Sequence, residues 1–130
     1  MRKLAPYAEM LGIRVVATAD DSLLVSLPPS ETLGGRPGFL HGGVISGLLE
    51  IACYQALFRE LGDDERPKIK PIDVSVDFLR GGLMTIETFA VARIVRIGQR
   101  VANATAEAWQ DDRGKLIATA RMHLLLDRHR

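Results

Sequence analysis

The chain has 130 residues, enough for one domain with a small hydrophobic core. Its 17 basic and 16 acidic side chains give a net charge of +1, so there is no basic bias of the kind that nucleic-acid binding produces. The single cysteine excludes an internal disulfide, and no apolar stretch approaches membrane-spanning length. We therefore expect one cytoplasmic domain over residues 1–130 that binds neither nucleic acid nor membrane.

The N-terminal part is expected to form a short helix followed by a hairpin. Pro6 to Leu11 carries its apolar residues on one side, and Gly12 stands where a helix-ending glycine is expected. We expect this helix to act as a lid. Ile13–Ala19 and Leu23–Leu27 are strand-like, and the residue types at 20–22 favour a tight turn between them.

The most apolar segment is a predicted helix that begins after His41-Gly42-Gly43 and ends near Leu61-Gly62. A loop rich in Gly, Pro and Ser, residues 30–38, leads into it. Its apolar residues occupy nearly the whole circumference, which is typical of a helix buried on most sides. One carboxylate, Glu50, interrupts this pattern. It shares its face, at helical spacing, with Ser46, Gly47, Cys53 and Tyr54. A buried acid of this kind is either paired inside an interface or used in chemistry.

Four further strands are predicted after a polar segment, residues 63–70, that returns the chain to the sheet. They cover Ile72–Leu79, Thr85–Ile97, Val101–Gln110 and Leu116–Leu126, with turn residues between them. The first alternates apolar and polar residues and is therefore expected to be half-buried. Two strands, one helix and a four-strand meander predict an α+β domain with a largely antiparallel sheet.

Alanine recurs on one face of these strands. It occupies every second position of one strand and is echoed on both neighbours, at Ala90, Ala92, Ala102, Ala104, Ala106, Ala108, Ala118 and Ala120. Because small residues let a helix axis approach a sheet closely, we expect the central helix to lie on this alanine surface with the sheet curved around it.

The segment from Gly38 to Glu50 resembles the hotdog-fold acyl-CoA thioesterases, in the branch of the phenylacetate-degradation and 4-hydroxybenzoyl-CoA thioesterases. The matching features are Gly38, the triplet His41-Gly42-Gly43, and an acid nine positions after the histidine. Weaker matches extend the resemblance over nearly the whole chain, at residues 11–13, 78–80, 96–98 and 114–118. The resemblance implies a hotdog fold, in which a curved, largely antiparallel sheet wraps around one long central helix.

The same resemblance implies hydrolysis of an acyl-CoA or aryl-CoA thioester to the free acid and CoA. Glu50 would act as general base or as nucleophile, and the sequence does not choose between them. The amide of Gly43, with Gly42 beside it at the positive end of the helix, would stabilise the oxyanion. His41 would shape the turn and orient the site, with a general-base role as the alternative.

Residues for the substrate are expected around this motif and at the turns. The residues expected to line the acyl pocket are Phe39, Leu40, Tyr54 and Phe58, each with a core role as the alternative. Gly38 is a further predicted substrate-binding residue. Ser75 is expected on the strand facing Glu50. Arg96 and Arg100 are expected to meet the phosphates of coenzyme A or to be solvated edge charges. No metal-ligand spacing is present, so we expect no metal and no cofactor apart from coenzyme A as part of the substrate.

The chain also departs from the pattern of its relatives. Many relatives with Asp at the acid position carry Asn six residues before the histidine, where this chain has Gly35, and relatives with Glu often place Gln in that loop. Ser46, Tyr54 and Ser75 are the candidates for a second polar group. Two other functions stay open. One is a hotdog hydratase or dehydratase, which usually has an Asp–His pair on the loop and helix. The other is a non-catalytic acyl-CoA-binding module, which the missing Asn or Gln favours.

A single sheet wrapped on one helix leaves an apolar edge, so we expect a homodimer, or a homotetramer built from it. Gly43 and Glu50 are separated by roughly 10 Å along the helix axis, too far for both to meet the acyl carbon of one substrate. We therefore expect them to meet across the dimer, with the acyl chain entering between the subunits.

Overall fold

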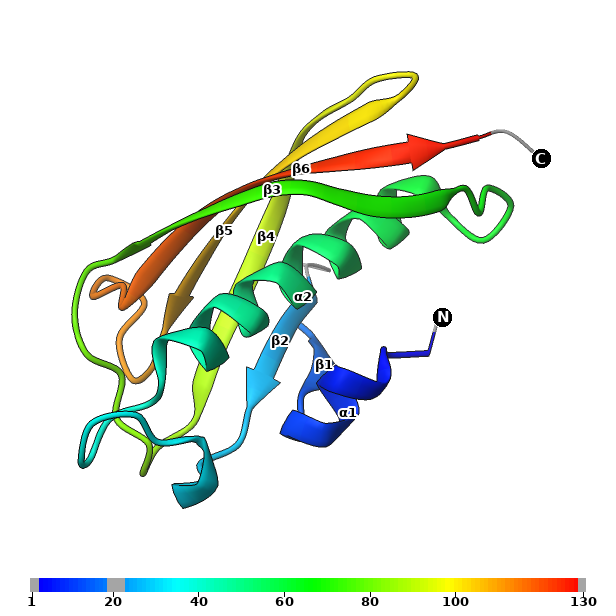
Figure 1. Cartoon of the computed structure of the whole chain (residues 1–130). Helices are drawn as coiled ribbons and strands as arrows, with labels where there is room; N and C mark the ends of the chain where they lie inside the picture. Colours follow the sequence, from blue (N-terminus) through cyan, green and yellow to red (C-terminus); the bar gives the residue numbers. More distant parts are fainter. Residues whose placement is uncertain (1–2, 19–22, 129–130) are drawn as a thin grey trace.

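A computed structural model describes residues 3–18 and 23–128 of the chain (Figure 1). Two α-helices, a short 3₁₀ helix and six strands follow one another along it. They are α1 (Pro6–Leu11), β1 (Arg14–Ala17), β2 (Leu23–Leu27), η1 (Glu31–Leu33), α2 (Gly42–Leu61), β3 (Lys68–Phe78), β4 (Thr88–Ile97), β5 (Val101–Trp109) and β6 (Ala118–Asp127). The predicted turn at 20–22 and the last residue of the first predicted strand lie outside the described residues.

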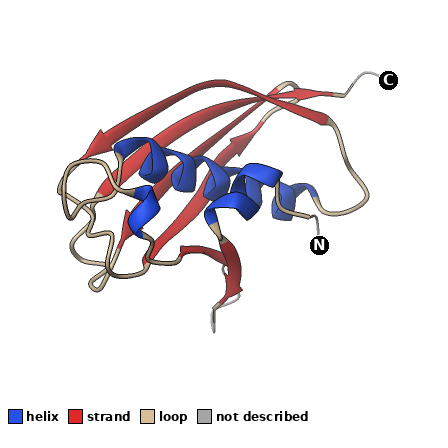
Figure 2. Ribbon diagram, turned by 60° about the horizontal axis from the view of Figure 1, so that its bottom comes forward, coloured by secondary structure: helices blue, strands red, loops and turns tan. Residues whose placement is uncertain are grey.

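The strands form one sheet in the order β1-β2-β4-β5-β6-β3, and every neighbouring pair is antiparallel. After α2 the chain therefore crosses the sheet and places β3 at its far edge. The long helix α2 runs along one face, and the strands curve around it (Figures 1 and 2). This confirms the predicted α+β architecture with an antiparallel sheet. The predicted four-strand meander is wrong, because β3 pairs with β6 and not with β4, whose other neighbour is β2.

The surface that receives α2 is built of alanine, as predicted. Seven alanines on β4, β5 and β6 are at most 5% exposed: Ala90, Ala102, Ala104, Ala106, Ala108, Ala118 and Ala120. Opposite them α2 supplies Ile45, Leu48, Leu49 and Ala52, all buried. At this contact the larger side chains thus come from the helix, which lies mainly over β4 and β5.

The ends of both α-helices follow local signals. Gly12 has the positive φ of 78° expected after α1, and its N–H donates to the carbonyls of Ala8 and Glu9. Gly62 has a φ of 72° and donates to the carbonyl of Phe58 at the end of α2. Glycine is favoured at such positions because it has no Cβ to clash. The predicted helix ends are confirmed.

The starts of β3 and β4 differ most from the prediction, and the other strand bounds differ by at most two residues. β3 begins at Lys68, within the segment predicted to be a connection, because Lys68 and Ile69 pair with Asp127 and Leu126 at the end of β6. β4 begins at Thr88, three residues later than predicted. Before it, both backbone groups of Leu83 bond to the side-chain amide of Gln110, which holds this segment outside the ladder.

The prediction that β3 is half-buried is wrong for the single chain. Its apolar residues include Ile72, Val74 and Phe78, and these are 52%, 36% and 54% exposed. They lie at the edge of the sheet, where α2 makes few contacts. The alternating pattern shows that one face is apolar, but it does not show what covers that face.

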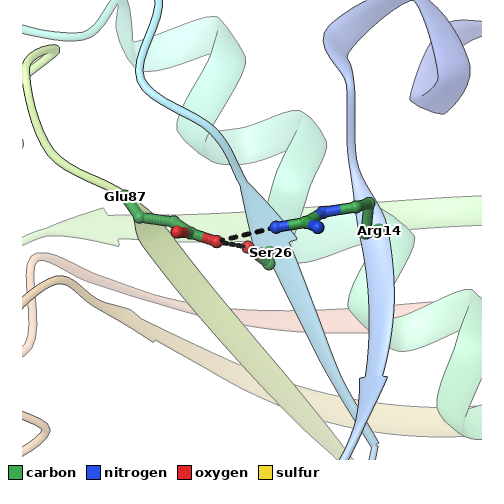
Figure 3. Close-up of polar contacts among 3 residues, drawn as sticks. All are labelled: Arg14, Ser26 and Glu87. Carbon is green, nitrogen blue, oxygen red and sulfur yellow. Dashed lines mark hydrogen bonds and ion pairs between the residues drawn. The ribbon is translucent and has the colours of Figure 1, made fainter.

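A polar cluster fastens the β1–β2 hairpin to the rest of the sheet (Figure 3). Ser26 on β2 is fully buried, and its hydroxyl donates to the carboxylate of Glu87, just before β4. The guanidinium of Arg14 on β1 lies 3.5 Å from the same carboxylate. The Glu87 carboxylate therefore joins both strands of the hairpin to the start of β4, 61 residues after Ser26.

Candidate active site

The site begins where the loop of residues 34–41 meets the N-terminus of α2. His41 is the N-cap residue, and its Nδ1 accepts a 2.8 Å hydrogen bond from the N–H of Gly43. Its carbonyl accepts from the N–H groups of Val44 and Ile45. Among the described residues the N–H of Gly42 has no hydrogen-bond acceptor. The predicted oxyanion donor, Gly43, is thus engaged within its own chain, whereas the amide before it is open.

The loop before His41 is tightly folded. The N–H of Gly35 donates to the carbonyl of Phe39, and the N–H of Phe39 donates to the carbonyl of Arg36. Gly38 completes this turn with a φ of 86°, a conformation that favours glycine. The N–H of His41 then donates to the carbonyl of Leu33, which fixes the histidine at the start of the helix.

The position at which many relatives carry Asn has little room for a side chain. A Cβ placed on Gly35 would lie 3.1 Å from the Cα of His41 and 3.5 Å from its backbone nitrogen. A larger residue at position 35 would therefore require the backbone of the loop to shift. Where those relatives have the Asn side chain, this chain has the backbone of Gly35 packed against the backbone of His41.

Glu50 lies in the second turn beyond this N-terminus and is half-buried. Among the described residues its carboxylate has no hydrogen bond and no ion pair. Burial raises the pKa of Glu50 because it penalises the charged form. Within the described residues of one chain the acid is therefore unpaired, and pairing inside a dimer interface, one of the two explanations for it, stays a prediction.

The neighbours of Glu50 respond to its charge. Burial, and then the negative charge of Glu50, raise the pKa of Cys53 to about 12. The same two causes in the same order raise the pKa of Tyr54. The Cys53 thiol and the Tyr54 hydroxyl are therefore neutral at physiological pH. Of Glu50, Cys53 and Tyr54, only Glu50 can carry a negative charge there.

The residues predicted for the acyl pocket fall into different environments. Phe39 is half-buried, with the guanidinium of Arg36 4.2 Å from its ring centre. Leu40 is 7% exposed and belongs to the core of the chain. Tyr54 is half-buried, and its ring centre lies 6.0 Å from that of Phe58. The core alternative thus holds for Leu40, whereas Phe39 and Tyr54 remain accessible.

Phe78 belongs to this region but was not among the predicted site residues. Its ring lies beside the start of α2, because a Cβ placed on Gly42 would be 3.3 Å from its Cζ. The side chain is 54% exposed. Its position at the end of an alternating apolar strand was the signal that could have identified it.

Three predicted substrate residues lie away from α2. Ser75 lies on the outer face of the sheet, in a hollow of about 320 Å³ that also includes Arg121. The expectation that Ser75 faces Glu50 is therefore wrong. Arg96 pairs with Asn103 on β5, and Arg100 lies in the β4–β5 turn, at the end of the sheet opposite the start of α2 (Figure 1). One chain alone does not bring these side chains to the His-Gly-Gly motif.

The outer face of the sheet contains an Asp–His pair. Nδ1 of His123 lies 2.6 Å from Oδ1 of Asp73, on the neighbouring strand. It belongs to the face away from α2, so it is not the Asp–His pair of a hydratase, which would lie on the loop and helix. The sequence alone does not reveal this pair, because the register of β3 against β6 is needed to find it.

The described residues contain neither a metal-binding cluster nor a helix that could span a membrane. No group of three or more His, Cys, Asp or Glu side chains is placed to hold a metal ion. No helix within residues 3–18 and 23–128 is long and apolar enough to cross a membrane. The expectations of no metal and of a cytoplasmic location stay predictions.

Comparison with known proteins identifies the family. The thioesterase superfamily profile matches residues 37–117, more than half of the chain and including the His-Gly-Gly motif and Glu50. The chain belongs to the thioesterase superfamily. Comparison with curated proteins gave no match.

Solved structures of similar proteins agree with this membership. A protein from Chromobacterium violaceum is 37% identical, with a TM-score of 0.73 over 96% of this chain and 85% of that one. A mutant thioesterase from Pseudomonas aeruginosa is 28% identical, with a TM-score of 0.81 over 95% and 86%. A Bacillus halodurans protein crystallised with CoA is 24% identical, with a TM-score of 0.86 over 99% and 83%. The hotdog fold is confirmed, and superfamily membership supports thioester hydrolysis as the general reaction.

Proposed function

We propose that the protein hydrolyses acyl-CoA or aryl-CoA thioesters, with Glu50 as the group that activates water or attacks the acyl carbon. The observation that carries this proposal is the state of Glu50: a half-buried carboxylate with a raised pKa and no partner among the described residues. An acid kept for an ion pair within its own chain would be paired here. An unpaired acid close to an open helix N-terminus is suited to catalysis.

Either route balances with water alone. As a base, Glu50 takes a proton from water while the water oxygen bonds to the acyl carbon; the carbon–sulfur bond then breaks, and the sulfur leaves with that proton as the thiol of CoA. As a nucleophile, Glu50 itself bonds to the acyl carbon and displaces CoA thiolate, and water cleaves the resulting anhydride. Neither route requires a metal or a bound cofactor.

The oxyanion formed in both routes needs hydrogen-bond donors. The N-terminus of α2 offers the open N–H of Gly42 at the positive end of the helix dipole. The N–H of Gly43 becomes available when the imidazole of His41 turns away from it. His41 thus acts on the site through Gly43, which is the orienting role expected from the resemblance.

The complete site belongs to a homodimer in this proposal. β3 is an edge strand with exposed apolar residues, and such an edge is suited to pairing with a second copy. The separation of Gly43 and Glu50 along α2 supports a site that takes one from each chain. The neighbour crystallised with CoA supports coenzyme A as the carrier of the acyl group. A homotetramer would be a pair of such dimers.

A non-catalytic acyl-CoA-binding protein is the second candidate. It is favoured by the close packing at Gly35, which leaves no polar side chain there, and by the tie between Gly43 and His41. A hydratase has no comparable support, since the Asp–His pair lies on the other face of the sheet.

A release assay separates these functions. The protein is mixed with a panel of acyl-CoA and aryl-CoA thioesters, and free thiol is followed alongside equilibrium binding. Release that is faster than background and is lost in Glu50→Gln supports the thioesterase. Binding without release by the wild-type protein supports the binding module, and loss of an enoyl-CoA double bond without thiol release indicates a hydratase.

A further inference from the structure

The side chain of Tyr7 reaches from α1 onto the face of α2 that carries Glu50. A Cβ placed on Gly47 would lie 2.8 Å from the hydroxyl oxygen of Tyr7 and 2.9 Å from its Cε2. Tyr7 therefore rests directly on the backbone of α2, and only glycine at position 47 leaves space for it. The helix α1 lies beside α2 in Figures 1 and 2.

Gly47 stands between the two parts of the motif. Gly43 is one turn before it and Glu50 nearly one turn after it, so all three lie on one face of α2. The hydroxyl of Tyr7 thus lies over the interval of roughly 10 Å that separates the helix N-terminus from the carboxylate. From Gly47 to Glu50 the rise along the helix axis is only about 4.5 Å.

This hydroxyl is available for a ligand. Tyr7 has no hydrogen bond among the described residues, and its side chain is 46% exposed. By contrast, the amide predicted to bind the oxyanion is already bonded to His41. The polar side chain that relatives place before the histidine is also missing, because position 35 is glycine packed on backbone.

We propose that the hydroxyl of Tyr7 donates a hydrogen bond to the carbonyl oxygen of the thioester, within the same chain as the Glu50 that acts on it. The inference rests on the proposed thioesterase function and names an additional catalytic residue for it. A tyrosine hydroxyl is a suitable donor because its O–H can be directed at a carbonyl oxygen. As charge develops on the carbonyl oxygen, this bond strengthens and lowers the barrier.

Two substitutions test the role of the Tyr7 hydroxyl in different ways. Tyr7→Phe removes the oxygen and keeps the ring. Gly47→Ala keeps the oxygen but places a methyl group where the ring rests, so the ring must move. We expect each to lower kcat about 10- to 100-fold with little change in KM, as for loss of a transition-state donor. The double variant should be no worse than the poorer single one, because the two changes remove one interaction.

The control is Met10→Leu, a change on the same helix at a side chain that is 72% exposed. It should leave kcat unchanged, and circular dichroism and urea unfolding should show all four variants folded. Tyr7→Phe with wild-type kcat, while Glu50→Gln is inactive, overturns this inference and leaves the proposed function standing. A rise in KM without loss of kcat overturns it too, since it shows packing of the substrate rather than donation. Wild-type protein that releases no thiol from any thioester overturns both.

Discussion

The Nδ1 atom of His41 accepts the hydrogen bond of the Gly43 amide, two residues along the chain. The histidine therefore caps the very helix whose N-terminus is expected to bind the oxyanion. A cap stabilises a helix by satisfying one of its free N–H groups, but it also occupies that group. The same nitrogen atom thus couples the stability of α2 to the availability of the Gly43 amide.

Replacing His41 by alanine should lower the free energy of unfolding by about 1 kcal/mol, the usual loss for a missing N-cap acceptor. His41→Asn supplies another side-chain acceptor and should recover most of that loss. Urea unfolding of the three proteins measures both changes. Equal stability of the alanine and asparagine variants would show that the bond to Gly43 contributes nothing.

Replacing Glu50 by glutamine should abolish most hydrolysis, by about 100-fold or more, because it keeps the shape and removes the base or nucleophile. It should not lower stability, since the carboxylate has no partner to leave behind among the described residues. Thiol release and urea unfolding check the two statements. A folded variant with full activity contradicts the catalytic role, and a strongly destabilised one indicates a structural pair.

The raised pKa of Glu50 also predicts two opposite responses to pH. Activity requires the ionised acid, so kcat/KM should fall as the pH is lowered through a pKa above the ordinary value of 4.5. Stability moves the other way. Because the folded state holds this proton more tightly than the unfolded state, the wild-type protein should lose stability relative to Glu50→Gln as the pH rises above about 4.5. Parallel pH series of rates and unfolding midpoints measure both; a constant difference in stability would contradict the shift.

Substituting Val74 by glutamate should convert the proposed dimer to a monomer. The side chain is 36% exposed in the single chain, so the change should cost little in folding but place a charge against the partner. Light scattering or sedimentation at micromolar concentration gives the mass. Arg121→Gln, an exposed change on β6 at the outer face, serves as the control. A wild-type monomer would contradict the dimer itself, and a dimeric variant would contradict this location for its interface.

Co-refolding tests whether a site draws on two chains. Gly43→Pro removes one amide in the first helical turn, where proline is tolerated, and Glu50→Gln removes the acid. Each homodimer should be nearly inactive, whereas the mixed dimer contains one site with both groups intact. Activity should therefore return on mixing. Mixed dimers that form, stay folded and remain inactive would contradict the shared site.

The central helix and the alanine surface beneath it were predictable, because both are marked by residues that are close together in the sequence. Glycine marks the ends of α1 and α2, and alternating alanine marks the face on which α2 lies. The face of β3 on which Ser75 lies could also have been predicted from the sequence. Its strand neighbours Val74 and Val76 form the apolar face, so a period of two places Ser75 on the opposite side.

Other features depend on distance information that a sequence does not carry. The pair of Asp73 and His123 follows from the register of β3 against β6. The contact between Tyr7 and Gly47 requires the angle at which α1 meets α2. The exposure of β3 depends on what lies beyond the sheet edge. In each case the sequence shows which residues are present, but it does not show which residue or surface lies next to them in the folded chain.

The position of β3 also bears on how the chain is made. Its only strand neighbour among the described residues is β6, the last of the six strands to be synthesised. While β4 and β5 are being synthesised, β3 is already complete and has no hydrogen-bonding partner in its own chain. Its backbone and apolar side chains are then open to other nascent chains on the same messenger. Synthesis of residues 118–127 ends that exposure, so slow translation of residues 79–117 should favour aggregation more than slow translation before residue 68.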